Sequence, residues 1–297
     1  DQDVPVDSGY TETAALRNIN NSNDLSMRTG YNITSNITAS FNFSRSATKS
    51  ISPNRVSSTV QHDYVLFQME EGSYDLRNDL ISGIPFPGWS IRWSGLERFP
   101  LFSKIARSVS LDHNFSGRYS TQSQDGKQSS ASYVQNLQPL VGLRFQLEHD
   151  ISLNASFGTT KKVTQSFNKS TSNDVLSTDV STRQNFSVSA SYQRRRGMHI
   201  PLPFLRDLNL ENNLNFTLTF DYNKSLTQRQ QGPEPFATVT DEYSWEVQPK
   251  IDYSFTNKVT GGIYYKFGRR YNNRRNTEGK PTKFSDFGLT VNIQIRG

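Results

Sequence analysis

The chain has 297 residues, of which 33% are hydrophobic and 20% charged, and a formal net charge of +6. With a mean hydropathy of −0.67 it has no stretch apolar and long enough for a transmembrane helix, which excludes a helical membrane protein. The absence of Cys excludes disulfides and thiolate chemistry, the four His lack metal-ligand spacing, and no nucleic-acid motif accompanies the positive charge, so neither cofactor, metal nor nucleic acid is expected.

The N-terminal part of the chain combines a polar segment, a strand and a long irregular stretch. Residues 1–28 are rich in Asn, Asp, Ser and Thr without periodicity, so they are predicted to be a polar loop or a disordered end. From Tyr31 polar and apolar residues alternate, which indicates a β-strand. Residues 44–86 lose this alternation and are predicted to be a long loop, so 29–297 is predicted to be one strand-rich segment interrupted at 44–86.

The next segment is predicted to be a strand with two tryptophans, followed by a connection at 97–105 in which the alternation stops. Trp89 and Trp93 lie on one face of the predicted strand, where interfacial aromatics are expected. After it, Phe99, Leu101 and Phe102 form a compact apolar turn. Two roles remain open for this turn: packing beneath the rim of a barrel, or docking a periplasmic partner.

The rest of the chain repeats an alternating pattern that predicts about ten strands in all. Tight turns are predicted near His149 and Thr256, and longer polar loops are predicted to begin at Ser120, Ser166, Gln228 and Arg269. Short turns on one side and long loops on the other are typical of outer-membrane barrels, whose short turns are periplasmic. This assignment places the C-terminus on the periplasmic side.

The hairpin at 243–267 has the clearest facing. Its apolar alternation is longer than the roughly five to six residues of a soluble strand and suits a strand that crosses an outer membrane. The aromatic residues at its ends are predicted to contact lipid or the lipid-water interface: Tyr243, Trp245, Tyr253, Phe255 and Tyr265.

A basic stretch follows this hairpin. Its arginines are candidates for contact with lipopolysaccharide phosphates: Arg269, Arg270, Arg274 and Arg275. A solvated basic loop is the alternative reading of the same residues.

One run, from Pro85 to Ser120, combines a proline-rich start, a strand that begins at a tryptophan, a Gly-Leu step, a connection containing Phe, Pro, Leu, Phe and Lys, and a further strand: PFPGWSIRWSGLERFPLFSKIARSVSLDHNFSGRYS. It resembles the C-terminal region of the SprA (Sov) family, the giant outer-membrane translocons of the type 9 secretion system of Bacteroidetes. The resemblance extends over most of 85–297. It implies that the chain is part of a longer polypeptide, and that its partners are secreted cargo proteins, a PorV-type lateral partner and a periplasmic plug protein.

The sequence therefore predicts an all-β, antiparallel transmembrane outer-membrane β-barrel protein with several passes, here an arc of about ten strands within a larger barrel. The expected function is the wall of a protein-conducting channel that exports folded cargo and contacts membrane lipid, lipopolysaccharide and the remaining strands of the barrel. A stand-alone, porin-like small barrel is the alternative. Catalysis is not expected, because no Ser, His and carboxylate are suitably grouped. A soluble carbohydrate-binding sandwich is disfavoured by strand length.

Overall fold

The computed structural model describes residues 19–52, 55–63, 86–168, 174–194, 198–199, 209–210, 212–256, 258–274 and 279–294. Within these ranges the chain forms one antiparallel sheet of 12 strands and a separate short hairpin. The predicted antiparallel all-β fold is confirmed. The described residues contain no helix that is long and apolar enough to cross a membrane.

Most strands of the sheet are long. The first strands are β1 (Ile19–Thr34), β2 (Ile37–Ser52), β3 (Arg55–Asp63), β4 (Gly88–Ser94), β5 (Ala106–Gln124), β6 (Lys127–Leu147) and β7 (Ile151–Phe167). They are followed by β8 (Val175–Arg194), β11 (Leu214–Gln231), β12 (Ala237–Ser254), β13 (Val259–Arg274) and β14 (Thr282–Ile293), while β9 (Met198–His199) and β10 (Asn209–Leu210) form the separate hairpin.

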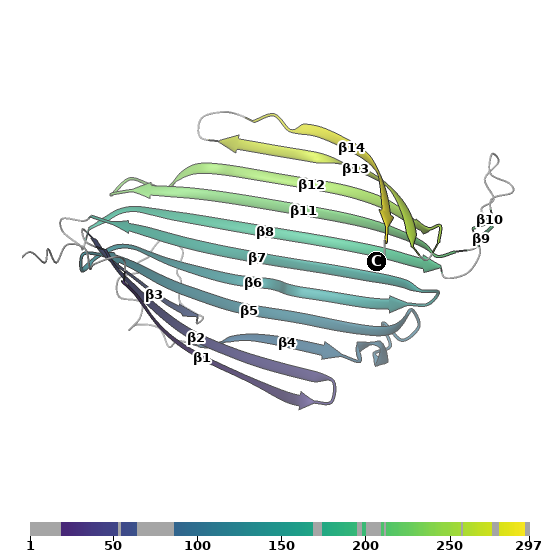
Figure 1. Cartoon of the computed structure of the whole chain (residues 1–297), viewed down its shortest axis with the longest axis horizontal. Coiled ribbons are helices and arrows are strands. Elements are labelled where there is room, and N and C mark those ends of the chain that lie inside the picture. Colours follow the sequence, from purple (N-terminus) through teal and green to yellow (C-terminus); the bar gives the residue numbers. More distant parts are fainter. Residues whose placement is uncertain are drawn as a thin grey trace, which may run out of the picture.

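Neighbours in the sheet are nearly always neighbours in sequence. The order is β1-β2-β3-β5-β6-β7-β8-β11-β12-β13-β14, with β4 paired to β2 and β5, so the path has eleven positions. Figure 1 shows the result as an open, twisted sheet whose two edges are β1 and β14. Such a meander is what short connections between consecutive antiparallel strands produce.

The third position of the sheet is occupied by two successive strands. Ser44 of β2 pairs with Asp63 of β3, whereas Asn42 of β2 pairs with Gly88 of β4. β3 and β4 therefore run in the same direction along β2, one after the other. The residues between Asp63 and Phe86 lie outside the described part of the chain.

Buried apolar residues form two clusters. One lies where β5 and β7 end and β6 and β8 begin, and register there aligns Tyr119, Tyr133, Val163 and Val180. The other lies at the opposite end, where Leu96, Ala106 and Val109 pack together around a 3-10 turn, η2 (Leu96–Arg98). The two clusters thus lie at opposite ends of β5 and β6.

Several predicted boundaries differ from the structure. Strand β1 starts at Ile19, inside the segment 1–28 predicted as polar loop, and all of its residues are exposed. Strands β2 and β3 occupy much of the loop predicted at 44–86. These segments are held by backbone pairing and carry mostly polar side chains on both faces, so they lack the apolar period on which the prediction relied.

The predicted long polar loop at Ser120 is also wrong. Strand β5 continues to Gln124 and turns through Asp125 and Gly126, whose φ values are 52° and 79°. Asp-Gly with two positive φ angles is a signal for a two-residue hairpin turn. Likewise β11 continues past Gln228 and β13 past Arg269. The sheet has 12 strands instead of about ten because β1 and β3, which lie largely in the polar segments predicted as loops, belong to it.

Candidate functional site: the two faces of the sheet

One face of the sheet carries rows of apolar side chains that cross many strands. Backbone register places in one row Ile37, Trp93, Leu111, Leu143, Ala155, Val188, Phe220, Val247 and Phe267. A second row joins Ile151, Tyr192, Phe216, Ile251, Ile263 and Leu289. We call the side of the sheet with these rows the apolar face.

Many large side chains of the apolar face are exposed. Phe216 is 37% exposed and Ile251 41%, and the exposed fraction reaches 71% for Leu289 on β14. A continuous exposed apolar surface of this extent is unfavourable in water, because soluble proteins rarely expose large apolar patches. Its alternation with polar residues along every strand is the pattern of a transmembrane barrel wall, apolar toward lipid and polar toward the interior.

The opposite side, which we call the polar face, carries charged side chains in pairs. Strands β12 and β13 are bridged by Lys266 and Glu246, 2.7 Å apart, and Arg229 binds both carboxylate oxygens of Asp179 at 2.6 and 3.0 Å. Register places these ion pairs on this face: Arg92–Asp112, Arg144–Asp112, Arg118–Asp63, Arg229–Asp179, Lys250–Asp252 and Lys266–Glu246.

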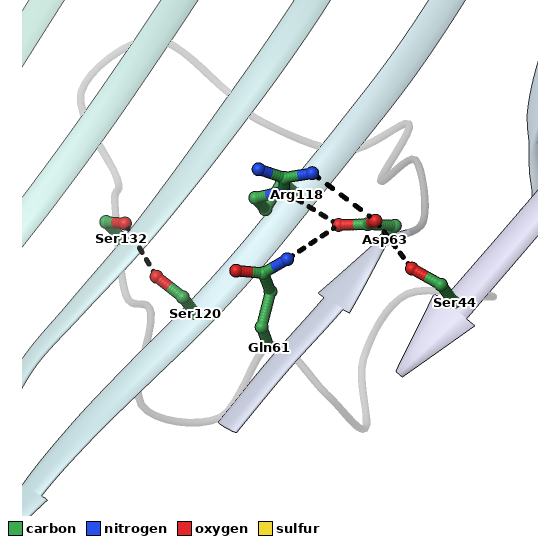
Figure 2. Close-up of polar contacts among 6 residues, drawn as sticks. All are labelled: Ser44, Gln61, Asp63, Arg118, Ser120 and Ser132. Atoms are coloured by element: carbon green, nitrogen blue, oxygen red, sulfur yellow. Dashed lines mark hydrogen bonds and ion pairs between the residues drawn. The ribbon is translucent and has the colours of Figure 1, made fainter. Parts of the chain in front are cut away.

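A polar cluster lies on this face at the point where β3 ends. Figure 2 shows Asp63 between β2 and β5, accepting hydrogen bonds from Arg118 at 2.8 Å, Ser44 at 2.6 Å and Gln61 at 3.4 Å. Nearby, the hydroxyls of Ser120 and Ser132 are 3.0 Å apart and link β5 to β6. The cluster ties the end of the interrupted strand to both of its neighbours.

The β5–β6 pair contains an irregularity halfway along the strands, where direct pairing stops between Asp112 and Ser116. Two side chains of β5 satisfy carbonyl groups of β6 there. His113 Nδ1 is 2.7 Å from the oxygen of Leu140, and Asn114 donates its amide to the oxygen of Gln138 at 3.1 Å. Carbonyl groups freed within a membrane need such partners, because no water replaces the lost hydrogen bonds.

The broken connection after β4 folds back onto the apolar face. Phe99 makes an edge contact with Trp93, with ring centroids 5.8 Å apart, and Phe102 packs on Phe145 at 5.7 Å. Leu101 contributes to neither contact and is 75% exposed. Of the predicted apolar turn, Phe99 and Phe102 therefore pack on the sheet, and Leu101 is exposed.

Glu97 fixes the start of this connection. Its carboxylate accepts a hydrogen bond from the backbone N–H of Val109 at 3.0 Å. This bond, which favours the charged form, holds the pKa of Glu97 below its usual value.

The predicted interfacial aromatics share the apolar face. Register aligns Tyr243 with Tyr271 and Trp245 with Arg269, and Tyr243 and Tyr271 stack with ring centroids 5.1 Å apart. Tyr253, Phe255 and Tyr265 follow at the same alternation, and Trp89 packs between Phe86 and Phe115. Their contact with lipid remains a prediction.

The four predicted lipopolysaccharide-binding arginines are not equivalent. Arg269 lies on the apolar face, next to Trp245. Arg270 lies on the polar face, with its guanidinium 4.4 Å from the ring centre of Phe284. Arg274 ends β13, and Arg275 lies outside the described residues. The loop prediction missed this division because it treated residues of a continuing strand as a loop.

No protein-family model and no curated protein matches the sequence. Among solved structures, OmpT, an outer membrane protein of Vibrio cholerae folded in vitro, matches at 10% sequence identity with a TM-score of 0.22. The match covers 93% of this chain and 95% of that chain. So low a TM-score supports no argument about function.

Proposed function

We propose that the chain forms part of the wall of an outer-membrane β-barrel that conducts proteins, and that this barrel is the translocon of the type 9 secretion system. The apolar face would contact lipid, and the polar face would line the passage. The chain itself carries out no reaction in this proposal, because a passage requires only a wall that is apolar outside and polar inside.

The direction of the two edge strands carries the first part of the proposal. Ten successive antiparallel pairings connect β1 to β14, so both edges run in the same direction. Closing the sheet on itself would require a parallel pair, whereas bacterial single-chain barrels have an even number of antiparallel strands. Left unpaired, both edges would expose backbone groups to hydrocarbon. An arc within a larger barrel satisfies these edges with further strands.

A larger barrel also suits protein passage, because barrel diameter grows with strand number. The polar face supports this role, since it combines paired carboxylates and cations with neutral polar side chains in a mixed, hydrophilic wall. Such a wall offers cargo no extended apolar surface on which to adhere.

The assignment to type 9 secretion rests on the resemblance from Pro85 to Tyr119. The structure adds context: this run forms β4, the connection that packs on the apolar face, and most of β5. By the same resemblance, the partners are a PorV-type protein beside the barrel and a plug protein on the periplasmic side.

Cysteine cross-linking to cargo tests the proposal, because the chain contains no cysteine of its own. Ser189 and Val188 are adjacent on β8 and lie on the polar and apolar faces respectively. With cargo arrested during export, Ser189→Cys should cross-link to cargo, and Val188→Cys should not. Equal cross-linking at both positions, or none at Ser189→Cys while secretion continues, would contradict a cargo-lining role. A stable, conducting monomer of residues 1–297 would favour the small-porin alternative.

A further inference from the structure

Two cations lie side by side on the apolar face near one end of β13 and β14. Arg269 pairs directly with Lys283 across the two strands, and both side chains are exposed. On its other side Arg269 pairs with Trp245 of β12. Like charges directly opposite each other in a sheet destabilise the pairing, so this arrangement calls for a compensating anion.

The protein supplies no such anion among the residues that the structure describes. The ion pairs described above lie on the polar face, and neither Arg269 nor Lys283 takes part in any of them. A third cation, Lys224, lies further along the same face, where it pairs with Tyr243. Six cations of the polar face are thus paired with carboxylates, whereas the exposed cation pair of the apolar face has no carboxylate partner among the described residues.

The two cations stand at one end of a groove with an aromatic floor. The groove has a volume of about 330 Å³ and is lined on the apolar face by Trp245, Tyr265, Phe267, Arg269 and Lys283. The rings of Tyr265 and Phe267 are stacked, with centroids 5.7 Å apart, and Trp245 meets Phe267 edge-on. Such a floor is open to a hydrocarbon chain, and the cations at its end suit a phosphate.

We propose that this groove binds lipopolysaccharide, with a phosphate of its lipid A held between Arg269 and Lys283 and an acyl chain lying on the rings of Trp245, Tyr265 and Phe267. The proposal rests on the membrane placement proposed above. Arginine binds phosphate with two parallel hydrogen bonds and lysine binds it as a point charge. The apolar floor selects a lipid over a free phosphate, because a soluble anion would leave the aromatic rings in water.

The position of the groove along the strands agrees with this ligand. The cation pair lies near the end of β13 that leads to residues 275–281, away from the end occupied by Val259 and Ile293. If the latter end is periplasmic, as the sequence predicts, the cations lie at the depth of the outer leaflet. Lipopolysaccharide provides phosphates at that depth.

The test measures binding of lipid A to the purified, full-length protein in mild detergent, using native mass spectrometry during a lipid titration. Arg269→Ala with Lys283→Ala should weaken binding by about tenfold for each cation removed, because each cation makes charge-assisted hydrogen bonds to phosphate. Arg270→Ala is the matched control, since Arg270 is adjacent in sequence but lies on the polar face. It should bind like the unmodified protein.

Two further variants and one further probe make the result decisive. Arg269→Lys with Lys283→Arg keeps both charges and should retain binding, and Arg269→Gln with Lys283→Gln replaces the alanine variant if that one fails to assemble. Lipid A lacking its phosphates should bind the unmodified protein about as weakly as intact lipid A binds the double alanine variant. The site is refuted if dephosphorylated lipid A binds equally well, if Arg270→Ala loses as much affinity as the double variant, or if inorganic phosphate competes fully with the lipid. A failure of the membrane proposal is distinguishable, because then the unmodified protein would itself be soluble without detergent.

Discussion

An arginine placed at Leu218 of β11 should destabilise the barrel strongly. Leu218 lies on the apolar face, paired with Ala190 and Pro249, and is 39% exposed. It is four residues from both Leu214 and Tyr222, the ends of the apolar alternation on this strand. At about 3.4 Å per residue this is roughly 14 Å along the strand in each direction. A tilt of roughly 40° reduces that to about 10 Å of depth, so Leu218 lies near the middle of an apolar band about 25 Å tall.

At the midplane of the bilayer an arginine on the lipid face costs about 2–4 kcal/mol. This corresponds to a roughly 30-fold to 700-fold change in the folding equilibrium. Thr219→Arg is the matched control, because Thr219 is adjacent on the same strand but pairs with Ser189 and Gln248 on the polar face. It should change the free energy of unfolding by less than about 1 kcal/mol. The assay is urea titration of the assembled barrel in lipid vesicles, and equal destabilisation by both arginines would refute the facing of the sheet.

Three further predictions concern the ends of the strands. The low pKa of Glu97 stabilises the fold above the unfolded value near 4.5, and this contribution is lost as the pH falls through the folded pKa. Glu97→Gln should therefore flatten the pH dependence of the urea midpoint in acid, and an unchanged profile would exclude the bond from Val109. Asp63→Ala should cost about 1 kcal/mol of unfolding free energy, because it removes charge-assisted hydrogen bonds that are partly exposed. Replacing Phe99 and Phe102 by Ser should lower the amount of assembled protein if they pack on the barrel, whereas normal assembly with blocked cargo release would indicate docking.

The sequence predicts the central part of the sheet well, for a physical reason. Where strands lie between lipid and a polar interior, every second residue must be apolar, so apolar and polar residues alternate along the sequence. The strand from Trp245 to Tyr253 is an example, because its aromatic and aliphatic residues alternate with polar ones over the length of one membrane crossing. The fold class follows from such segments.

Strands outside this constraint could not be predicted in the same way. In β3 only Val56 and Val60 are aliphatic, and the other positions are polar on both faces. Pairing with β2 and β5 holds this strand through backbone hydrogen bonds, which any residue except proline can donate. The continuation of β3 into β4 across the sheet is also invisible in the sequence, because it depends on the register of both with β2.

The same limit applies to the candidate lipid site. Side chains alternate between the two faces of a strand, so Arg269 and Arg270 would have been assigned to opposite faces if the sequence had shown that β13 extends to Arg274. The end of a strand is set by its partner, and Lys283 on β14 supplies the pairing that positions Arg269. The position of Arg269 therefore depends on its pairing with Lys283 on the neighbouring strand, although the sequence around Arg269 resembles a polar loop.

Because the edge strands β1 and β14 run in the same direction, only certain numbers of additional strands can close the barrel with antiparallel pairs. Strands joined as hairpins come in twos, so adding hairpins alone to eleven positions would keep the total odd. An even antiparallel barrel therefore requires an odd number of added strand positions, and β1 should never pair with β14. Thr29→Cys with Phe41→Cys is the positive control, because these residues pair directly across β1 and β2 and lie within disulfide reach.

Cysteines placed in pairs along β1 and β14, for example at Tyr31 and Leu289, should form no disulfide within one chain at any register. In the assembled protein each should instead cross-link to a cysteine on a strand contributed from elsewhere in the barrel. Efficient closure of β1 onto β14 in the membrane would mean that the eleven positions make a barrel by themselves. The lumen would then be too narrow for a folded protein, because diameter follows strand number, and the proposed translocon function would fail with it.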